Sequence, residues 1–189
     1  MPHYLLNKPH SHLSQFVNQH TTRRNKKMLG YLHDFAPGTM SIGRLDENSE
    51  GLLLLTTDGK VSAAILGRKV EKEYYVQLDG VITDEAIAQL NEGVEIGFDG
   101  KRYTTLPGKV IRLDPEPEFS WPPKRVRHAA HGPTSWVSVT IREGKYRQVR
   151  KMTAAVGFPV VRLIRVRIGH VHLGTLLPGE VLEVEDFGF

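Results

Sequence analysis

Residues 41–59 read SIGRLDENSEGLLLLTTDG and join a polar loop to a strongly apolar run. Gly43 opens the loop, which carries the guanidinium of Arg44 and the carboxylate of Asp46. The four leucines at 52–55 stand between turn residues, and such a continuous apolar run is typical of a strand covered on both faces. We therefore expect a buried strand to hold the polar loop in place.

Asp46 is the candidate catalytic carboxylate of this loop. An aspartate between two leucine-bearing stretches is more often a cap or an ion-pair partner. A carboxylate beside a buried strand is partly desolvated, however, and an arginine at about 4 Å offsets roughly 4 kcal/mol of that cost at an effective dielectric constant near 20. The pairing keeps the carboxylate ionised and oriented, as a nucleophile or a base requires.

The composition indicates an ordinary globular protein. The 189 residues are 40% apolar and 24% charged, so disorder is not expected. Cysteine is absent, which excludes disulfides, thiolate zinc sites and thiol nucleophiles. The N-terminus lacks the apolar core of a signal peptide, and no apolar run approaches the ~18 residues of a membrane span. We expect a soluble, cytoplasmic protein without membrane contact.

Positive charge is concentrated in one segment. Residues 119–179 hold eleven Lys and Arg against a single acid, Glu143, a net charge of +10, whereas the whole chain carries +4. A short basic run is usually a solvated face. Eleven cations in one segment indicate a polyanionic partner, with nucleic acid the first candidate.

Periodicity and turn residues predict alternating strands and helices. A hairpin is expected at Asp99-Gly100, and a short helix or turn at 31–35. Thr57 or Asp58 can cap the first helix, and Thr83 the second. Strands are expected at 3–9, 39–42, 52–55, 74–78, 110–113, 136–141 and 160–168, and helices at 60–66, 84–92 and 147–156.

Two basic elements sort their charges by face. In the helix at 147–156, Val149 and Met152 share one side and Arg150 lies on the opposite one. In the strand at 160–168, Arg165 and Arg167 alternate with apolar residues. Both elements are therefore expected to present cations to a ligand.

Residues 114–135 form an irregular, basic, proline-rich segment. It carries Trp121 and begins the basic stretch. A loop of this length inside a compact domain is usually functional or disordered. We interpret it as a candidate RNA-contacting loop, with disorder in the free protein as the alternative.

Motifs for cofactors and metals are missing. The sequence has no phosphate loop, Rossmann glycine pattern, nucleophile elbow or zincin motif. The pairs His128 with His131 and His170 with His172 lack a third ligand candidate, so they are expected to lie on the surface or to face RNA. No cofactor and no metal are expected.

Several linked motifs resemble the RsuA/RluB/RluE/RluF family of pseudouridine synthases. They are Asn7-Lys8-Pro9, the segment 43–59, KEYYV at 72–76 and EGKYRQVRKM at 143–152. The resemblance covers nearly the whole chain and is greatest to the RluE-type branch. It implies isomerisation of a uridine in 23S ribosomal RNA, free or in an assembly intermediate.

The resemblance also implies roles for matching residues. Asp46 would be the essential aspartate, Tyr74 would stack on the uracil and assist proton removal, and Arg150 would pair with Asp46. Arg44 would hold the opened RNA. Together with the charge pattern, the predicted RNA contacts are Arg44, Lys8, Lys124, Arg125, Arg127, Lys145, Arg147, Lys151, Arg165 and Arg167.

The implied fold is α+β, with a mixed, mainly antiparallel sheet flanked by helices and two lobes around a cleft. One lobe would comprise residues 1–67 with part of the C-terminal half, and the remainder would form the other. We expect a single catalytic domain over 1–189, without a separate N-terminal RNA-binding domain, acting as a monomer.

Three alternatives remain open from the sequence. One is a non-catalytic RNA-binding protein, and another is a pseudouridine synthase acting on a different RNA. The third is a glycoside or nucleoside hydrolase that pairs Asp46 with Glu47 or Glu50. No second acid stands near the cationic helix, which disfavours the hydrolase.

Overall fold

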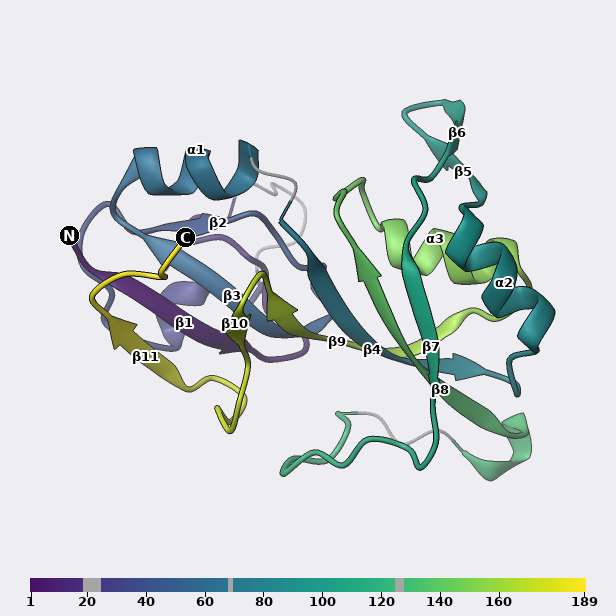
Figure 1. Ribbon diagram of the computed structural model, residues 1–189. Helices are drawn as coiled ribbons and strands as arrows, with labels where there is room; N and C mark the ends of the chain where they lie inside the picture. Colours follow the sequence, from purple (N-terminus) through teal and green to yellow (C-terminus); the bar gives the residue numbers. More distant parts are fainter. Residues whose placement is uncertain (19–24, 68–69, 125–127) are drawn as a thin grey trace. The chain divides into compact units, whose positions relative to one another are not determined.

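The computed structural model describes residues 1–18, 25–67, 70–124 and 128–189 (Figure 1). The chain divides into two compact units. Unit 1 comprises Met1–Val70 and Arg165–Phe189, and unit 2 comprises Glu71–Ile164. The predicted division into two lobes is therefore confirmed, with the first boundary at Val70 instead of residue 67.

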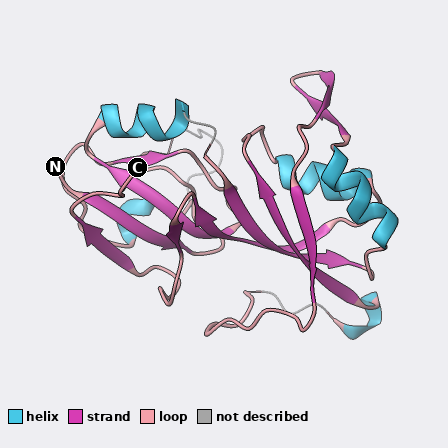
Figure 2. Ribbon diagram, in the orientation of Figure 1, coloured by secondary structure: helices cyan, strands magenta, loops and turns pink. Residues whose placement is uncertain are grey.

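Unit 1 is built on antiparallel strands (Figure 2). Strand β1 pairs with β3 on one side and with β11 on the other, while β2 also pairs with β3. The elements of unit 1 are β1 (His3–Lys8), η1 (Leu29–Tyr31), β2 (Met40–Ile42), β3 (Glu50–Thr56), α1 (Gly59–Gly67), β10 (Val171–His172), β11 (Val181–Val184) and the second half of β9 (Val160–Ile168).

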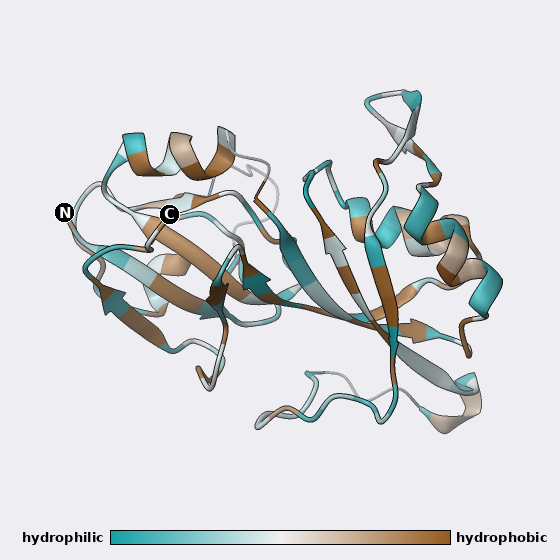
Figure 3. Ribbon diagram, viewed as in Figure 1, coloured by the Kyte–Doolittle hydropathy of each residue, from teal (hydrophilic) through white to brown (hydrophobic). Residues whose placement is uncertain are grey.

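The core of unit 1 surrounds β3. Every residue of this strand is buried, and the four leucines at 52–55 have no exposed surface, as their sequence predicts. Figure 3 shows β3 as a hydrophobic band. Leu53 and Leu55 pack with Tyr4, Leu6 and Leu29. Burial of each leucine contributes about 1.5–3 kcal/mol, which fixes the strand that follows the polar loop.

Gly51 allows a close approach within this core. Its φ is +106°, and a Cβ atom at this position would stand 2.3 Å from the carbonyl oxygen of Arg165. Only glycine fits both the backbone conformation and the space.

Unit 2 is also antiparallel. Strand β8 pairs with β4 and with β7, and β5 pairs with β6 in a hairpin around Asp99-Gly100, as predicted. The elements of unit 2 are β4 (Lys72–Asp79), α2 (Asp84–Glu92), β5 (Glu95–Phe98), β6 (Lys101–Thr104), β7 (Lys109–Leu113), η2 (Ala129–His131), β8 (Thr134–Ile141), α3 (Gln148–Ala155) and the first half of β9.

Capping side chains set the helix starts that the sequence predicts. An Oδ1 of Asp58 accepts the backbone N–H of Lys60 at 2.8 Å. The hydroxyl of Thr83 accepts the N–H of Ala86 at 3.2 Å at the start of α2.

The strand pairings of both units confirm the predicted α+β fold with a mainly antiparallel sheet. Among the described residues, no helix has the length and apolar content of a membrane span.

Candidate active site

The backbone before Asp46 is fixed by one buried hydroxyl. Ser14 Oγ donates to the carbonyl oxygen of Leu45 at 2.8 Å and accepts the N–H of Leu45 at 3.0 Å. Ser14 is 5% exposed, so water competes little for these hydrogen bonds. Leu45 is buried as well and anchors the loop to the core of unit 1.

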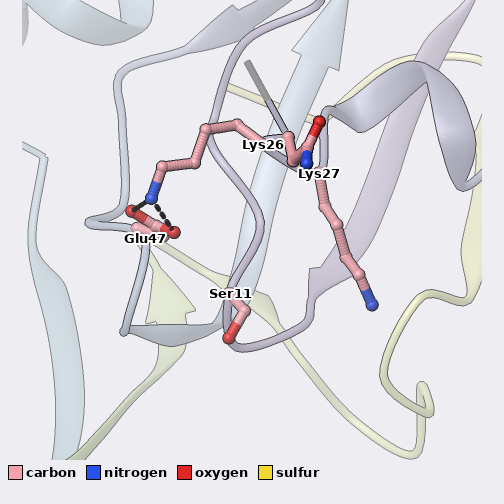
Figure 4. Close-up of a pocket in the computed structure, with 5 residues that line it drawn as sticks. Ser11, Lys26, Lys27 and Glu47 are labelled. Carbon is pink, nitrogen blue, oxygen red and sulfur yellow. Dashed lines mark hydrogen bonds and ion pairs between the residues drawn. The ribbon is translucent and has the colours of Figure 1, made fainter. Parts of the chain in front are cut away.

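The backbone after Asp46 is fixed by contacts to Glu47 from Lys8, Ser11 and Lys26. The carbonyl oxygen of Glu47 accepts the N–H of Ser11 at 2.7 Å and the ammonium of Lys8 at 3.5 Å. Lys26 Nζ donates to both carboxylate oxygens of Glu47, at 2.6 Å to Oε1 and 2.7 Å to Oε2 (Figure 4). Asp46 is therefore held from both neighbouring residues, which is the preorganisation that a reacting carboxylate needs.

A pocket of about 320 Å³ lies beside this loop. It is lined by Ser11, Asn25, Lys26, Lys27 and Glu47. Figure 4 shows Lys26 turned to Glu47, while the ammonium of Lys27 points away from that carboxylate. The pocket thus places two ammonium groups beside the loop that carries Asp46.

Lys8 is the most deeply buried cation of this region. It has no exposed surface, and Nζ donates to the carbonyl oxygens of His12 at 2.8 Å and Pro9 at 3.0 Å. Burial lowers the pKa of Lys8 to about 7, and the guanidinium of Arg165 acts in the same direction. The carboxylates of Glu50, Asp46 and Glu47 oppose that shift, in this order of size. Lys8 thus couples β1 to the charge of the Asp46 loop.

The other two predicted catalytic residues belong to unit 2. Tyr74 lies on β4 opposite Val139 and is 9% exposed. Arg150 lies in α3 and is half-buried, beside the buried Val149. Because Asp46 lies in unit 1, the meeting of these three side chains stays a prediction.

A hydrogen-bond network fixes the segment that leads into α3. The carboxylate of Glu143 accepts Gln148 Nε2 at 2.6 Å, the N–H of Leu106 at 2.8 Å and the hydroxyl of Tyr103. The hydrogen bond to Glu143 raises the pKa of Tyr103 above its ordinary value. Gln148 is 3% exposed, so the N-terminus of the basic helix is rigidly attached to unit 2.

The basic side chains around α3 have local partners. Lys145 Nζ lies 4.9 Å from the ring centroid of Tyr103. Lys151 Nζ donates to the carbonyl oxygen of Gly97 at 2.7 Å. Arg147 precedes α3 with a left-handed φ of +53°. Their charges are thus presented from ordered positions around the helix.

A family model described as RNA pseudouridylate synthase matches residues 2–155. The chain belongs to this family. The resemblance seen in the motifs is confirmed, and the protein is an RNA pseudouridine synthase by family.

Relatives and a solved structure agree with this family. The ribosomal large subunit pseudouridine synthase E of Vibrio parahaemolyticus is 40% identical over 185 residues, covering 96% of this chain and 73% of that protein. The protein of the same name from Xanthomonas axonopodis pv. citri is 42% identical over 179 residues, covering 92% and 89%. A crystal structure of a pseudouridylate synthase has a TM-score of 0.75 at 29% identity and covers 97% of this chain and 70% of that one.

Burial changes the interpretation of two cations of this pseudouridine synthase. Lys8 has no exposed surface, and Arg165 is 3% exposed, with Nε donating to the carbonyl oxygen of Leu52 at 2.8 Å. Direct contact of either residue with RNA, which the sequence predicts, does not fit this burial. Both are interior groups because the strands that carry them are covered on both sides.

The remaining predicted RNA contacts differ in their surroundings. Arg44 and Lys124 are exposed. Arg167 is half-buried, and its Nη1 donates to the carbonyl oxygen of Gly169 at 2.6 Å. Arg125 and Arg127 lie outside the described residues. Sequence reasoning missed Ser14 and Lys26. Both contact the Asp46 loop from distant positions in the chain, which no local sequence pattern reveals.

Proposed function

We propose that this pseudouridine synthase isomerises a specific uridine of large-subunit (23S) ribosomal RNA. The names of relatives that match most of the chain support this substrate. The observation that carries the assignment of the site is the fixed backbone on both sides of Asp46. Such a loop suits a carboxylate that must meet one atom of a bound nucleotide.

The reaction rearranges bonds within one nucleotide. The N1–C1′ bond breaks, the uracil turns, a C5–C1′ bond forms, and the proton lost from C5 is balanced by one gained at N1. Asp46 acts as the nucleophile or base, and Tyr74 stacks on the uracil and assists removal of the C5 proton. Arg150 keeps Asp46 ionised, and Arg44 holds the opened RNA.

Lys8 and Ser14 act as positioning residues in this proposal. Lys8 donates to the backbone around the Asp46 loop and balances its carboxylates, while Ser14 fixes Leu45. The cations at the surface then hold the RNA backbone, which offsets the cost of extruding the uridine from its stack. These surface cations are Arg44, Lys124, Lys145, Arg147, Lys151 and Arg167.

Asp46→Asn tests the proposed chemistry. We expect pseudouridine formation in a 23S transcript to fall roughly 10²- to 10⁴-fold, with the Kd for RNA within about twofold of wild type. Asp34→Asn is the matched control, because Asp34 is an exposed aspartate of the same unit. Equal rates for wild type and Asp46→Asn would rule out the assigned role.

The oligomeric state and the place of action are part of the same proposal. We propose a monomer that acts in the cytoplasm on free ribosomal RNA or on an assembly intermediate. Light scattering of the purified protein tests the monomer, because a mass near twice 21.3 kDa would contradict it. The rate of pseudouridine formation is measured on naked transcript and on precursor particles. The faster of the two rates identifies the substrate.

A further inference from the structure

Unit 2 contains an aromatic pocket outside the proposed catalytic residues. Its volume is about 510 Å³, within the range of small-ligand sites. The irregular segment that follows β7 forms one wall through Phe119 and Trp121. Strand side chains form the other wall, namely Gln77 on β4, Trp136 on β8 and Arg162 on β9.

The pocket lies on the face of β4 opposite to Tyr74. Gln77 and Trp136 are directly paired in the β4–β8 ladder, so their side chains share one face. Tyr74 and Val76 alternate with Gln77 and point to the other, buried face. A uracil stacked on Tyr74 therefore cannot occupy this pocket at the same time.

The walls form a preordered stacking surface. The ring centroid of Phe119 lies 5.2 Å from the ring centroid of Trp121 and 6.0 Å from that of Trp136. The guanidinium of Arg162 lies 5.1 Å from the Phe119 centroid, and Arg162 is 8% exposed. Aromatic rings and guanidinium planes are the groups on which proteins stack unpaired bases of RNA.

The polar groups of the pocket favour a base over a phosphate. Gln77 Nε2 donates to the hydroxyl of Thr134 at 3.0 Å, which orients its amide. Glu116 adds an exposed carboxylate, which repels phosphate but accepts N–H groups from a base edge. Phe119, Trp121, Trp136 and Arg162 belong to the segment 119–179, whose charge of +10 attracts RNA.

We propose that this pocket binds one unstacked nucleobase of the RNA substrate, a base other than the uridine that reacts. The proposal rests on the proposed function only in taking RNA as the ligand. It adds a second point of recognition, so the enzyme would select its target by the reacting uridine and by a second base that reaches the opposite face of β4.

Ultraviolet crosslinking locates the base. Full-length wild-type protein is irradiated with total ribosomal RNA, and the crosslinked peptide and nucleotide are mapped by mass spectrometry and primer extension. We expect a crosslink from Phe119 or Trp121 to a nucleotide other than the modified uridine. A crosslink to the modified uridine itself would overturn the proposal.

Trp121→Ala measures the contribution of stacking. We expect the Kd for the RNA to rise roughly 5- to 100-fold, and Trp121→Phe to restore most of the affinity. Tyr31→Ala is the control, because Tyr31 is 76% exposed and lies in unit 1. Its Kd should stay within about twofold of wild type. An unchanged Kd for Trp121→Ala would refute the pocket, and unchanged thermal unfolding of the variant excludes a folding defect.

An abasic nucleotide at the crosslinked position completes the test. It should weaken wild-type binding by the same factor as Trp121→Ala and should not weaken that variant further. Additive losses would show that Trp121 contacts something else. Pseudouridine formation by the wild type is measured separately, so that crosslinking without modification of 23S RNA would remove the proposed function and keep the pocket.

Discussion

The ammonium of Lys8 illustrates how one residue depends on its surroundings. Its three hydrogen-bond acceptors are carbonyl oxygens of Pro9, His12 and Glu47, and it has no exposed surface. The sequence places Lys8 in a motif shared with RNA-modifying enzymes but does not say which groups surround it. Burial depends on contacts between residues far apart in the chain, which the sequence alone does not show. For this reason Lys8, predicted to contact RNA, is an interior residue in the structure.

Lys8→Met should lower the free energy of unfolding by about 3 kcal/mol. The substitution leaves the carbonyl oxygens of Pro9, His12 and Glu47 without their buried hydrogen-bond donor, and this loss exceeds the apolar gain. Urea unfolding measures the change. Lys60→Met, at an exposed position of α1, should change the free energy by less than about 0.5 kcal/mol. Equal stability of Lys8→Met and wild type would contradict the proposed role.

The lowered pKa of Lys8 also predicts a pH dependence. Between a folded pKa of about 7 and an ordinary value of 10.5, the unfolded chain binds more protons at Lys8 than the folded chain. The contribution of Lys8 to the free energy of unfolding therefore rises with pH in this window, by at most about 1.4 kcal/mol per pH unit, and is lost again as the pH falls through 7. The difference between wild type and Lys8→Met, measured from pH 6.5 to 9.5, should grow accordingly. Parallel curves would contradict this.

At the scale of elements, local patterns predict some strands better than others. The leucine run of β3 and the caps of α1 and α2 are local signals, and the structure confirms them. Alternation in β9 predicts outward arginines, yet Leu163, Ile164 and Arg165 are all buried because this part of the strand is covered on both faces. Strands β10 and β11 are short and partly exposed, so they leave no clear pattern.

Gly51→Ala tests the packing of β3. The new methyl group would meet the backbone of Arg165, and the φ of +106° would strain it further, so we expect a loss of about 2–3 kcal/mol or more in the free energy of unfolding. Gly59→Ala is the matched control, because a Cβ there has open space at the start of α1. Chemical unfolding of both variants gives the comparison, and two equally stable variants would disprove the close approach.

At the scale of the whole molecule, the sequence predicts two units but not which strands pair with one another inside them. The charge of residues 119–179 and the apolar patterns are visible in the chain. The mainly antiparallel sheet follows only from family resemblance, since periodicity does not reveal which strands pair. The approach of Arg150 to Asp46 joins residues about a hundred positions apart and stays a prediction for the same reason.

RNA binding should depend strongly on salt. If about six of the cations contact phosphates, the logarithm of the association constant should fall with the logarithm of salt concentration at a slope near −4 for single-stranded RNA. Fluorescence anisotropy with a labelled 23S fragment measures this slope. A slope close to zero would show that the positive segment does not hold the RNA backbone.

The central claim is that Asp46 converts a uridine of 23S ribosomal RNA to pseudouridine. Its most direct test is pseudouridine mapping of total ribosomal RNA from cells with the gene, without it, and with only the Asp46→Asn variant. We predict one 23S pseudouridine that is present in the first map and missing from the other two. An identical map in all three cells would contradict the claim.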